Sequence, residues 1–135
     1  MTTDGKEIGK NYKLNTDANN SNVTTLVNKA KSAVIYGRII RLYLADSYFY
    51  IYIFVGKYRD YILYNNYCSC KYFIFNNIFR QHKIKCYHQL ALEIALQQDK
   101  IRNIVVDKNT LEDIIMEIYS MDKSFILRKL IFSEV

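Results

Sequence analysis

The sequence lacks most of the features that would identify an enzyme or a membrane protein. It has no proline or tryptophan, four glycines and three cysteines in 135 residues. No apolar run reaches about 18 residues, so we expect no membrane-spanning helix. No phosphate-binding loop, GxSxG motif or pair of carboxylates in an expected cleft occurs. The acids of the predicted helices are expected on solvated faces: Glu93, Glu112, Asp113 and Glu117. We therefore expect no enzymatic activity.

The start of the chain also lacks the apolar segment of a secretory signal. Residues 1–20 are polar and show no apolar periodicity, so we expect a disordered tail. Three cysteines, two of them in a CxC pair, favour a reducing cytoplasm, with association with the nucleoid as an extension of that location. The net charge of +6 supports solubility, or affinity for an acidic partner such as nucleic acid.

Residues 21–135 are about the size of one compact domain, and their patterns predict an α+β fold. Apolar residues recur at helical spacing from Val23 to Val34, which predicts an N-terminal helix. The following residues are rich in Tyr, Phe, Ile and Leu and predict an antiparallel β-meander. Its three strands are expected near 38–45, 48–55 and 58–67. One face of the middle strand is aromatic and either binds a partner or is covered by helices, which we favour.

The second half of the chain predicts further helices. One begins near Cys86 and runs toward Lys100. Thr110, followed three residues later by Asp113, resembles a capping box, and a clean apolar helical face follows it. The final SFILRKLIF segment predicts another short helix or strand.

Four residues form the most specific pattern in the sequence. Cys68 and Cys70 form a CxC pair, and Cys86 and His88 form a CxH pair after 15 intervening residues. Residues two apart in a strand have Cα atoms roughly 6.6 Å apart, whereas two sulfurs on one zinc ion are only about 3.8 Å apart. The chain must therefore bend at Ser69. Since side chains two apart do not share a helix face, Cys86 must precede the helix and His88 must lie in its first turn.

Three thiolates and one imidazole are the full ligand set of a closed tetrahedral zinc site. Because no position is left for water or substrate, the sequence predicts one structural Zn²⁺ per chain, and no cysteine is left over for a disulfide. His82 is an alternative imidazole ligand, but its neighbours are basic and we favour a surface position. The alternative to a metal site is that the cysteines are small core residues.

The motifs CSC and CYHQLA resemble the SWIM zinc finger, whose pattern is CxC, a variable spacer and CxH. Ala91 extends the similarity to CxHxxA, the form of the SWIM subunit of the Shu recombination complex and its archaeal relatives. The resemblance covers about 38–100. Two positions depart from it, because Lys71 replaces a frequent proline and Tyr87 replaces a frequent basic residue. It implies a zinc core with a ββα finger at 58–100, followed by a C-terminal helical extension at 101–135.

The resemblance also implies a non-enzymatic module that binds DNA or proteins. In the recombination branch, the SWIM protein pairs with a RecA-family recombinase paralogue and helps filaments to assemble on single-stranded DNA. We therefore expect an adaptor in homologous recombination. Its partner contacts are expected in the apolar C-terminal segment, at Phe125, Leu127, Leu130 and Phe132.

The alternative function is direct nucleic-acid binding by the zinc core at 58–100, which we call the zinc lobe, on single-stranded DNA or in transcription. Four basic residues are interleaved with aromatic rings, a combination suited to phosphates and stacked bases: Lys71, Arg80, Lys83 and Lys85. The same pattern describes an ordinary amphipathic segment with Phe73, Ile74 and Phe79 buried, which we favour. Nucleic acid could thus be contacted directly or through the protein partner.

Overall fold

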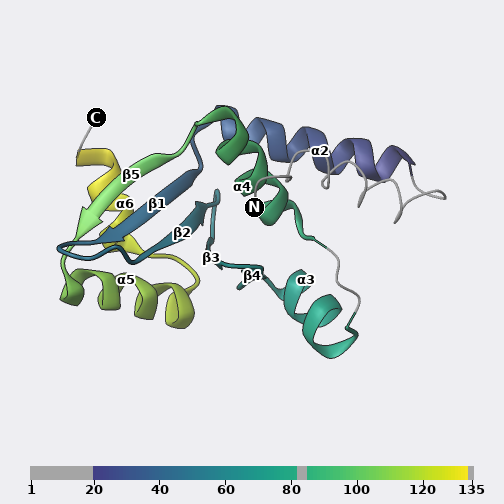
Figure 1. Cartoon of the computed structure of the whole chain (residues 1–135). Helices are drawn as coiled ribbons and strands as arrows, with labels where there is room; N and C mark the ends of the chain where they lie inside the picture. The colour runs from purple at the N-terminus through teal and green to yellow at the C-terminus, as the bar shows by residue number, and fades with distance from the viewer. Residues whose placement is uncertain (1–19, 82–84, 134–135) are drawn as a thin grey trace.

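The computed structural model describes residues 20–81 and 85–133 (Figure 1). The predicted tail lies outside this range, apart from its last residue. The first described element, α2 (Asn20–Ile35), confirms the predicted N-terminal helix. Gly37 follows it with a φ of 69°, a left-handed conformation that glycine adopts without steric cost. Within 20–81 and 85–133, no helix combines the length and apolar character needed to cross a bilayer.

A five-stranded sheet forms the centre of the fold, in the order β4-β3-β2-β1-β5. The strands are β1 (Ile39–Leu44), β2 (Tyr50–Val55), β3 (Asp60–Tyr64), β4 (Tyr67–Cys68) and β5 (Arg102–Val106). The first four strands pair antiparallel in chain order, whereas β5 pairs parallel with β1. With helices before and after the strands, the structure confirms the predicted α+β class and the β-meander.

Two predictions about strands were wrong. The third strand does not continue over 58–67, because Asn65 has a left-handed φ of 53° and starts a turn back to β4. Leu63 then pairs with Cys68, which makes a hairpin. The extension at 101–135 is also not entirely helical. β5 occupies its start and buries Ile104 and Val106 on one face.

The predicted capping box at Thr110 was misplaced by three residues. Helix α5 (Lys108–Met121) begins earlier, because the side chain of Asp107 accepts a hydrogen bond from the backbone N–H of Thr110 at 2.8 Å. The final segment is a helix, α6 (Phe125–Ser133), and not a strand.

Helices cover both faces of the sheet because successive strand residues point to opposite sides. On one face, α2 and α4 (Tyr87–Gln98) pack with Ile39, Phe54 and Leu63. On the other face, α5 and α6 pack with Ile40, Leu42 and the neighbouring apolar residues of β2, β3 and β5. Figure 1 shows α2 and α4 together near the start of β1, from which β1 runs away. The predicted helical cover of the aromatic face is therefore incomplete, and Tyr50 is 38% exposed.

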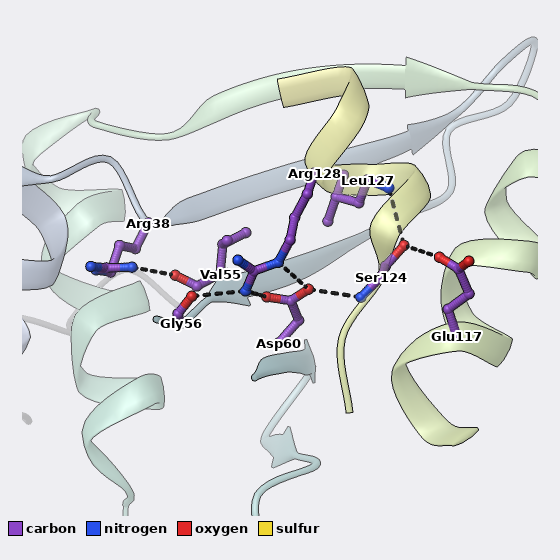
Figure 2. Close-up of polar contacts among 8 residues, drawn as sticks. All are labelled: Arg38, Val55, Gly56, Asp60, Glu117, Ser124, Leu127 and Arg128. Atoms are coloured by element: carbon purple, nitrogen blue, oxygen red, sulfur yellow. Dashed lines mark hydrogen bonds and ion pairs between the residues drawn. The ribbon is translucent and has the colours of Figure 1, made fainter. Parts of the chain in front are cut away.

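A buried ion pair attaches α6 to the sheet (Figure 2). The Asp60 carboxylate, at the start of β3, pairs with the guanidinium of Arg128, and the shortest distance is 2.6 Å. It also accepts a hydrogen bond from the backbone N–H of Ser124 at 2.9 Å. The Ser124 hydroxyl donates in turn to Glu117 on α5 at 2.8 Å, and Arg128 donates to the Gly56 carbonyl at 2.8 Å. The position of α6 is thus fixed by charge as well as by apolar packing.

Candidate metal centre

The β3–β4 hairpin and the turn after it position Cys68 and Cys70. Cys68 is the last residue of β4, and Cys70 is the N-cap of the short helix α3 (Lys71–Phe73). Between them, the Ser69 N–H donates to the Ile62 carbonyl at 3.0 Å, and the Ser69 hydroxyl accepts from the Ile62 N–H at 2.9 Å. These two bonds fix the point at which the chain leaves the sheet. As a result, Cys68 at the end of the strand and Cys70 at the helix cap lie in the same cluster of donor residues.

The start of α4 positions Cys86 and His88 as the spacing predicted. Cys86 is the N-cap, with extended φ and ψ of −81° and 168°, and His88 lies in the first turn. The Gln89 side chain accepts a hydrogen bond from the Cys86 N–H at 3.1 Å and donates to the Asn66 carbonyl at 3.0 Å. Gln89 therefore ties the start of α4 to the turn between β3 and β4.

The four donor atoms lie close enough together to bind one ion. All of them are within 4.8 Å of one another, and the Cys68 Sγ is 3.7 Å from the His88 Nδ1. A sulfur and a nitrogen that bind one tetrahedral zinc ion are about 3.6 Å apart, which is close to this distance. The residues are also buried, with exposed fractions of 0% for Cys68, 5% for Cys70, 2% for Cys86 and 7% for His88.

Aromatic side chains surround the imidazole of His88. The ring centroids of Tyr61, Tyr87 and Phe54 lie 4.0, 4.4 and 4.7 Å from that of His88. Such packing restricts the rotation of the imidazole and excludes water from the site. Tyr61 and Phe54 come from β3 and β2, so the sheet itself sets the orientation of the fourth ligand.

The three thiols affect one another's protonation. Hydrogen bonding with Cys70 raises the pKa of the Cys68 thiol, and the same contact lowers the pKa of Cys70. Burial raises the pKa of Cys86 to about 12. Three thiolates cannot share so small and dry a space without a cation, whereas a divalent ion stabilises all three. The positive N-terminus of α4 favours the remaining negative charge.

Comparison with known protein families agrees with this donor set. Residues 55–97 match the SWIM zinc finger. The matched segment runs from the end of β2 into the last turn of α4 and contains all four donors. Cys68, Cys70, Cys86 and His88 thus form one structural zinc site, and the SWIM finger is a binding domain that is typically non-catalytic. Neither the curated proteins nor the solved structures contain a match to the chain.

Zinc held by these residues would stabilise the fold by joining the end of the hairpin to the start of α4. A ligand set of three thiolates and one imidazole fills a tetrahedral ion and leaves no site for a reacting group. Sequence reasoning missed Gln89, which positions the ligands without binding the metal. The sequence did contain a pattern that indicates this role of Gln89, because a glutamine three residues after an N-cap is typical of a capping box.

The basic residues predicted for nucleic-acid binding differ in their surroundings. Lys71 and Arg80 are exposed at the two ends of a segment formed by α3 and the π-helix η1 (Ile74–Phe79). Lys85 is half-buried and forms an ion pair with Glu93. Lys83 and the alternative ligand His82 lie outside the described residues.

The aromatic residues of this segment are more exposed than an ordinary amphipathic helix would require. Phe73 is buried as expected, but Phe79 is 70% exposed and its predicted burial was wrong. Phe75 is 55% exposed and its ring centroid lies 5.8 Å from that of Phe79. These two rings of η1 are therefore exposed to solvent and not part of the core.

The C-terminal residues predicted for partner contact also differ from one another in their exposure to solvent. Leu127 is completely buried against α5 and the sheet, so its assignment to a contact surface was wrong. Leu130 is half-buried, whereas Phe125 and Phe132 are 55% and 72% exposed. The helix presents one side to the core, and the spacing of an apolar segment alone does not say which side that is.

Proposed function

We propose that this protein is a non-enzymatic, zinc-stabilised adaptor in homologous recombination. In this role it binds a RecA-family recombinase paralogue and assists filament assembly on DNA. The observation that carries the proposal is the closed ligand set of the SWIM finger, which leaves the metal no reactive position. Function must then reside in surfaces that the metal keeps in place. The role implies a cytoplasmic protein that is associated with the nucleoid when its complex engages DNA.

The exposed side of α6 is the surface we assign to the protein partner. Phe125 and Phe132 expose large apolar area there, beside the half-buried Leu130. Large apolar side chains at the centre of a contact supply most of the binding energy in many interfaces. The Asp60–Arg128 ion pair fixes α6 before any partner arrives, which reduces the entropy lost on binding.

Copurification from the native cell tests this assignment. Full-length tagged protein should recover a RecA-family paralogue, and Phe125→Ala with Phe132→Ala should abolish that recovery. Phe75→Ala is the matched control, because Phe75 and Phe125 have the same exposed fraction of 55% but Phe75 lies in η1. Recovery of other proteins without any RecA-family member would contradict the proposal.

Direct binding of nucleic acid by the zinc lobe is the second candidate function. It is favoured by the exposed cations Lys71 and Arg80 on the segment that exposes the rings of Tyr72, Phe75 and Phe79. Cations that contact phosphates make binding depend on salt, and exposed rings can stack on unpaired bases. The same surface could serve single-stranded DNA or a transcription complex.

Titration of an oligonucleotide at several salt concentrations tests this second function. Lys71→Ala with Arg80→Ala should weaken binding and flatten its salt dependence. Lys85→Ala is the matched control, because Lys85 is already paired with Glu93 and contributes less free charge. Equal effects of the two changes would argue against phosphate contacts by the lobe.

A further inference from the structure

One part of the sheet surface has no helix of residues 20–81 or 85–133 packed on it. We call it the open sheet face and define it by six residues of β1, β2 and β5: Arg41, Tyr43, Tyr50, Tyr52, Asn103 and Val105. The strand register places them in two adjacent rows. One row runs Asn103, Arg41, Tyr52 across the three strands, and the next runs Val105, Tyr43, Tyr50.

The helices α2 and α4 stop short of this face. They cover Ile39 and Phe54, the preceding row of the same side of the sheet, and Tyr52 packs against the edge of that cluster. Beyond it, Val105 is 65% exposed and Tyr50 is 38% exposed. Tyr43, Tyr50 and Val105 belong to neither of the two apolar clusters formed by the described residues. The surface is therefore aromatic, adjacent to the core and accessible.

Arg41 provides the positive charge at the centre of the open sheet face. Its guanidinium carbon lies 5.3 Å from the ring centroid of Tyr52, 5.5 Å from that of Tyr50 and 6.0 Å from that of Tyr43. These cation–π contacts hold the guanidinium among the rings. Among the described residues no carboxylate pairs with it, since the ion pairs there are Lys85 with Glu93 and Arg128 with Asp60.

The hydrogen bonds of Arg41 are long and incomplete. Its Nη1 donates to the Tyr43 hydroxyl at 3.4 Å and to the Asn103 Oδ1 at 3.5 Å, both at the outer limit of a hydrogen bond. Its Nε is enclosed and has no acceptor in the part of the chain that the structure describes. An enclosed donor without an acceptor is unfavourable, so a small rotation toward an incoming anionic oxygen would cost little. Arg41 is thus a charged group whose capacity to donate hydrogen bonds is only partly used by the described residues.

The tyrosine rings beside Arg41 have faces available for stacking. Tyr50 meets Tyr43 and Tyr52 edge to face, with ring centroids 5.3 and 5.4 Å apart and interplanar angles of 61° and 74°. Because T-shaped neighbours do not cover both faces of a ring, a planar group can still stack there. Asn103 is exposed at the end of the Arg41 row and offers an amide that can both donate and accept.

From these observations we propose that the open sheet face binds single-stranded nucleic acid. Unpaired bases stack on Tyr50 and Tyr43, a phosphate accepts hydrogen bonds from Arg41, and Asn103 contacts a base edge. The net charge of +6 favours a polyanion over an acidic or neutral protein loop. A duplex fits poorly, because its bases are stacked on one another and cannot reach the rings. This site is on β1, β2 and β5, and is separate from both the zinc lobe and α6.

Fluorescence anisotropy with labelled oligothymidylate, oligouridylate of equal length and a duplex tests the proposal on the zinc-loaded full chain. Comparing the DNA strand with the RNA strand shows which of the two single-stranded nucleic acids the face prefers. Tyr50→Leu should weaken single-strand binding about tenfold, a typical loss for one stacked base. Arg41→Gln should also lower the salt slope by about 0.7, the value for one phosphate contact on a single strand.

Tyr58→Leu is the matched control, because Tyr58 is 72% exposed but lies in the turn between β2 and β3. Zinc content and the melting curve should remain unchanged in all three variants, which excludes a loss of folding. Lys71→Ala with Arg80→Ala separates this site from binding by the zinc lobe. Wild-type affinity in both Tyr50→Leu and Arg41→Gln would overturn the proposal. So would loss of a copurifying protein partner in these variants without any change in oligonucleotide binding.

Discussion

Replacing Asp60 by asparagine tests how far one buried charge determines the position of α6. The side chain of Asp60 is completely buried, and that of Arg128 is 18% exposed. Asparagine keeps the shape and one acceptor oxygen but leaves the guanidinium without a counter-charge. Removing one partner of a buried ion pair costs about 3–5 kcal/mol. Arg128 retains its 2.8 Å bond to the Gly56 carbonyl and some contact with water, so we expect the lower end of that range.

The expected loss of about 3 kcal/mol lowers the melting temperature by roughly 10 °C in a domain of this size. The measurement is thermal unfolding of the zinc-loaded protein, followed by circular dichroism. Hydrogen exchange should rise first in α6, because one of the two carboxylate oxygens that accept from the Ser124 N–H and from Arg128 becomes an amide donor. A protein partner that binds α6, as proposed above, should then bind more weakly although no exposed residue of α6 has changed.

Two further variants make the reasoning refutable. Asp122→Asn is the matched control, because Asp122 is exposed and its φ of 64° is one that asparagine also tolerates. It should change stability by less than about 0.5 kcal/mol. Combining Asp60→Asn with Arg128→Met should cost less than the sum of the two single changes, since no unpaired buried charge remains. Equal melting temperatures for Asp60→Asn and Asp122→Asn would refute the role of the ion pair.

Three further predictions concern the metal site and the C-terminal helix. A chelator should unfold the finger. Cys86→Ser should lower the zinc content below one ion per chain, and added zinc should no longer shift the melting curve of this variant. If the melting curve of Cys86→Ser were the same as that of the unchanged protein, a structural metal would be excluded. At pH 7, zinc uptake by the metal-free protein should release protons, since the pKa values of the Cys68 and Cys86 thiols are raised and zinc binds thiolates. Because protons compete with the metal below these raised values, zinc affinity should increase with pH, and a pH-independent affinity would contradict the assignment. Leu127→Ala should cost about 2–5 kcal/mol of unfolding free energy because its side chain is fully buried, whereas Phe132→Ala, at a residue 72% exposed, should change the melting temperature little.

Local patterns were sufficient to predict the metal ligands and their immediate geometry. The spacing of Cys86 and His88 allows only one arrangement at the start of a helix, and the structure has that arrangement. The helix α2 and the strands β1 and β2 were likewise visible in apolar periodicity. In each case the signal lies within a few consecutive residues, so no knowledge of the rest of the fold is needed.

The features that were missed depend on distant parts of the chain. β5 is short, and it is stable as a strand because it pairs in parallel with β1, more than fifty residues earlier. Leu127 is buried against residues of the sheet that are distant in sequence, and the neighbouring ion pair of Arg128 with Asp60 joins residues 68 apart. The turn at Asn65 was local, and the adjacent Asn65 and Asn66 are a turn signal that the apolar residues on both sides of them obscured.

The segment between Cys70 and Cys86 has a consequence for how this protein could change in evolution. Both of its ends belong to the same metal site, and near the first end Phe73 also packs in the core, so the segment is anchored close to its ends. Its described residues contribute no strand to the sheet, and Phe75 and Phe79 among them are exposed to solvent. A closed loop of this kind tolerates changes of length and sequence at small entropic cost. The segment is therefore the part of the finger in which new binding specificity could be acquired without redesigning the fold.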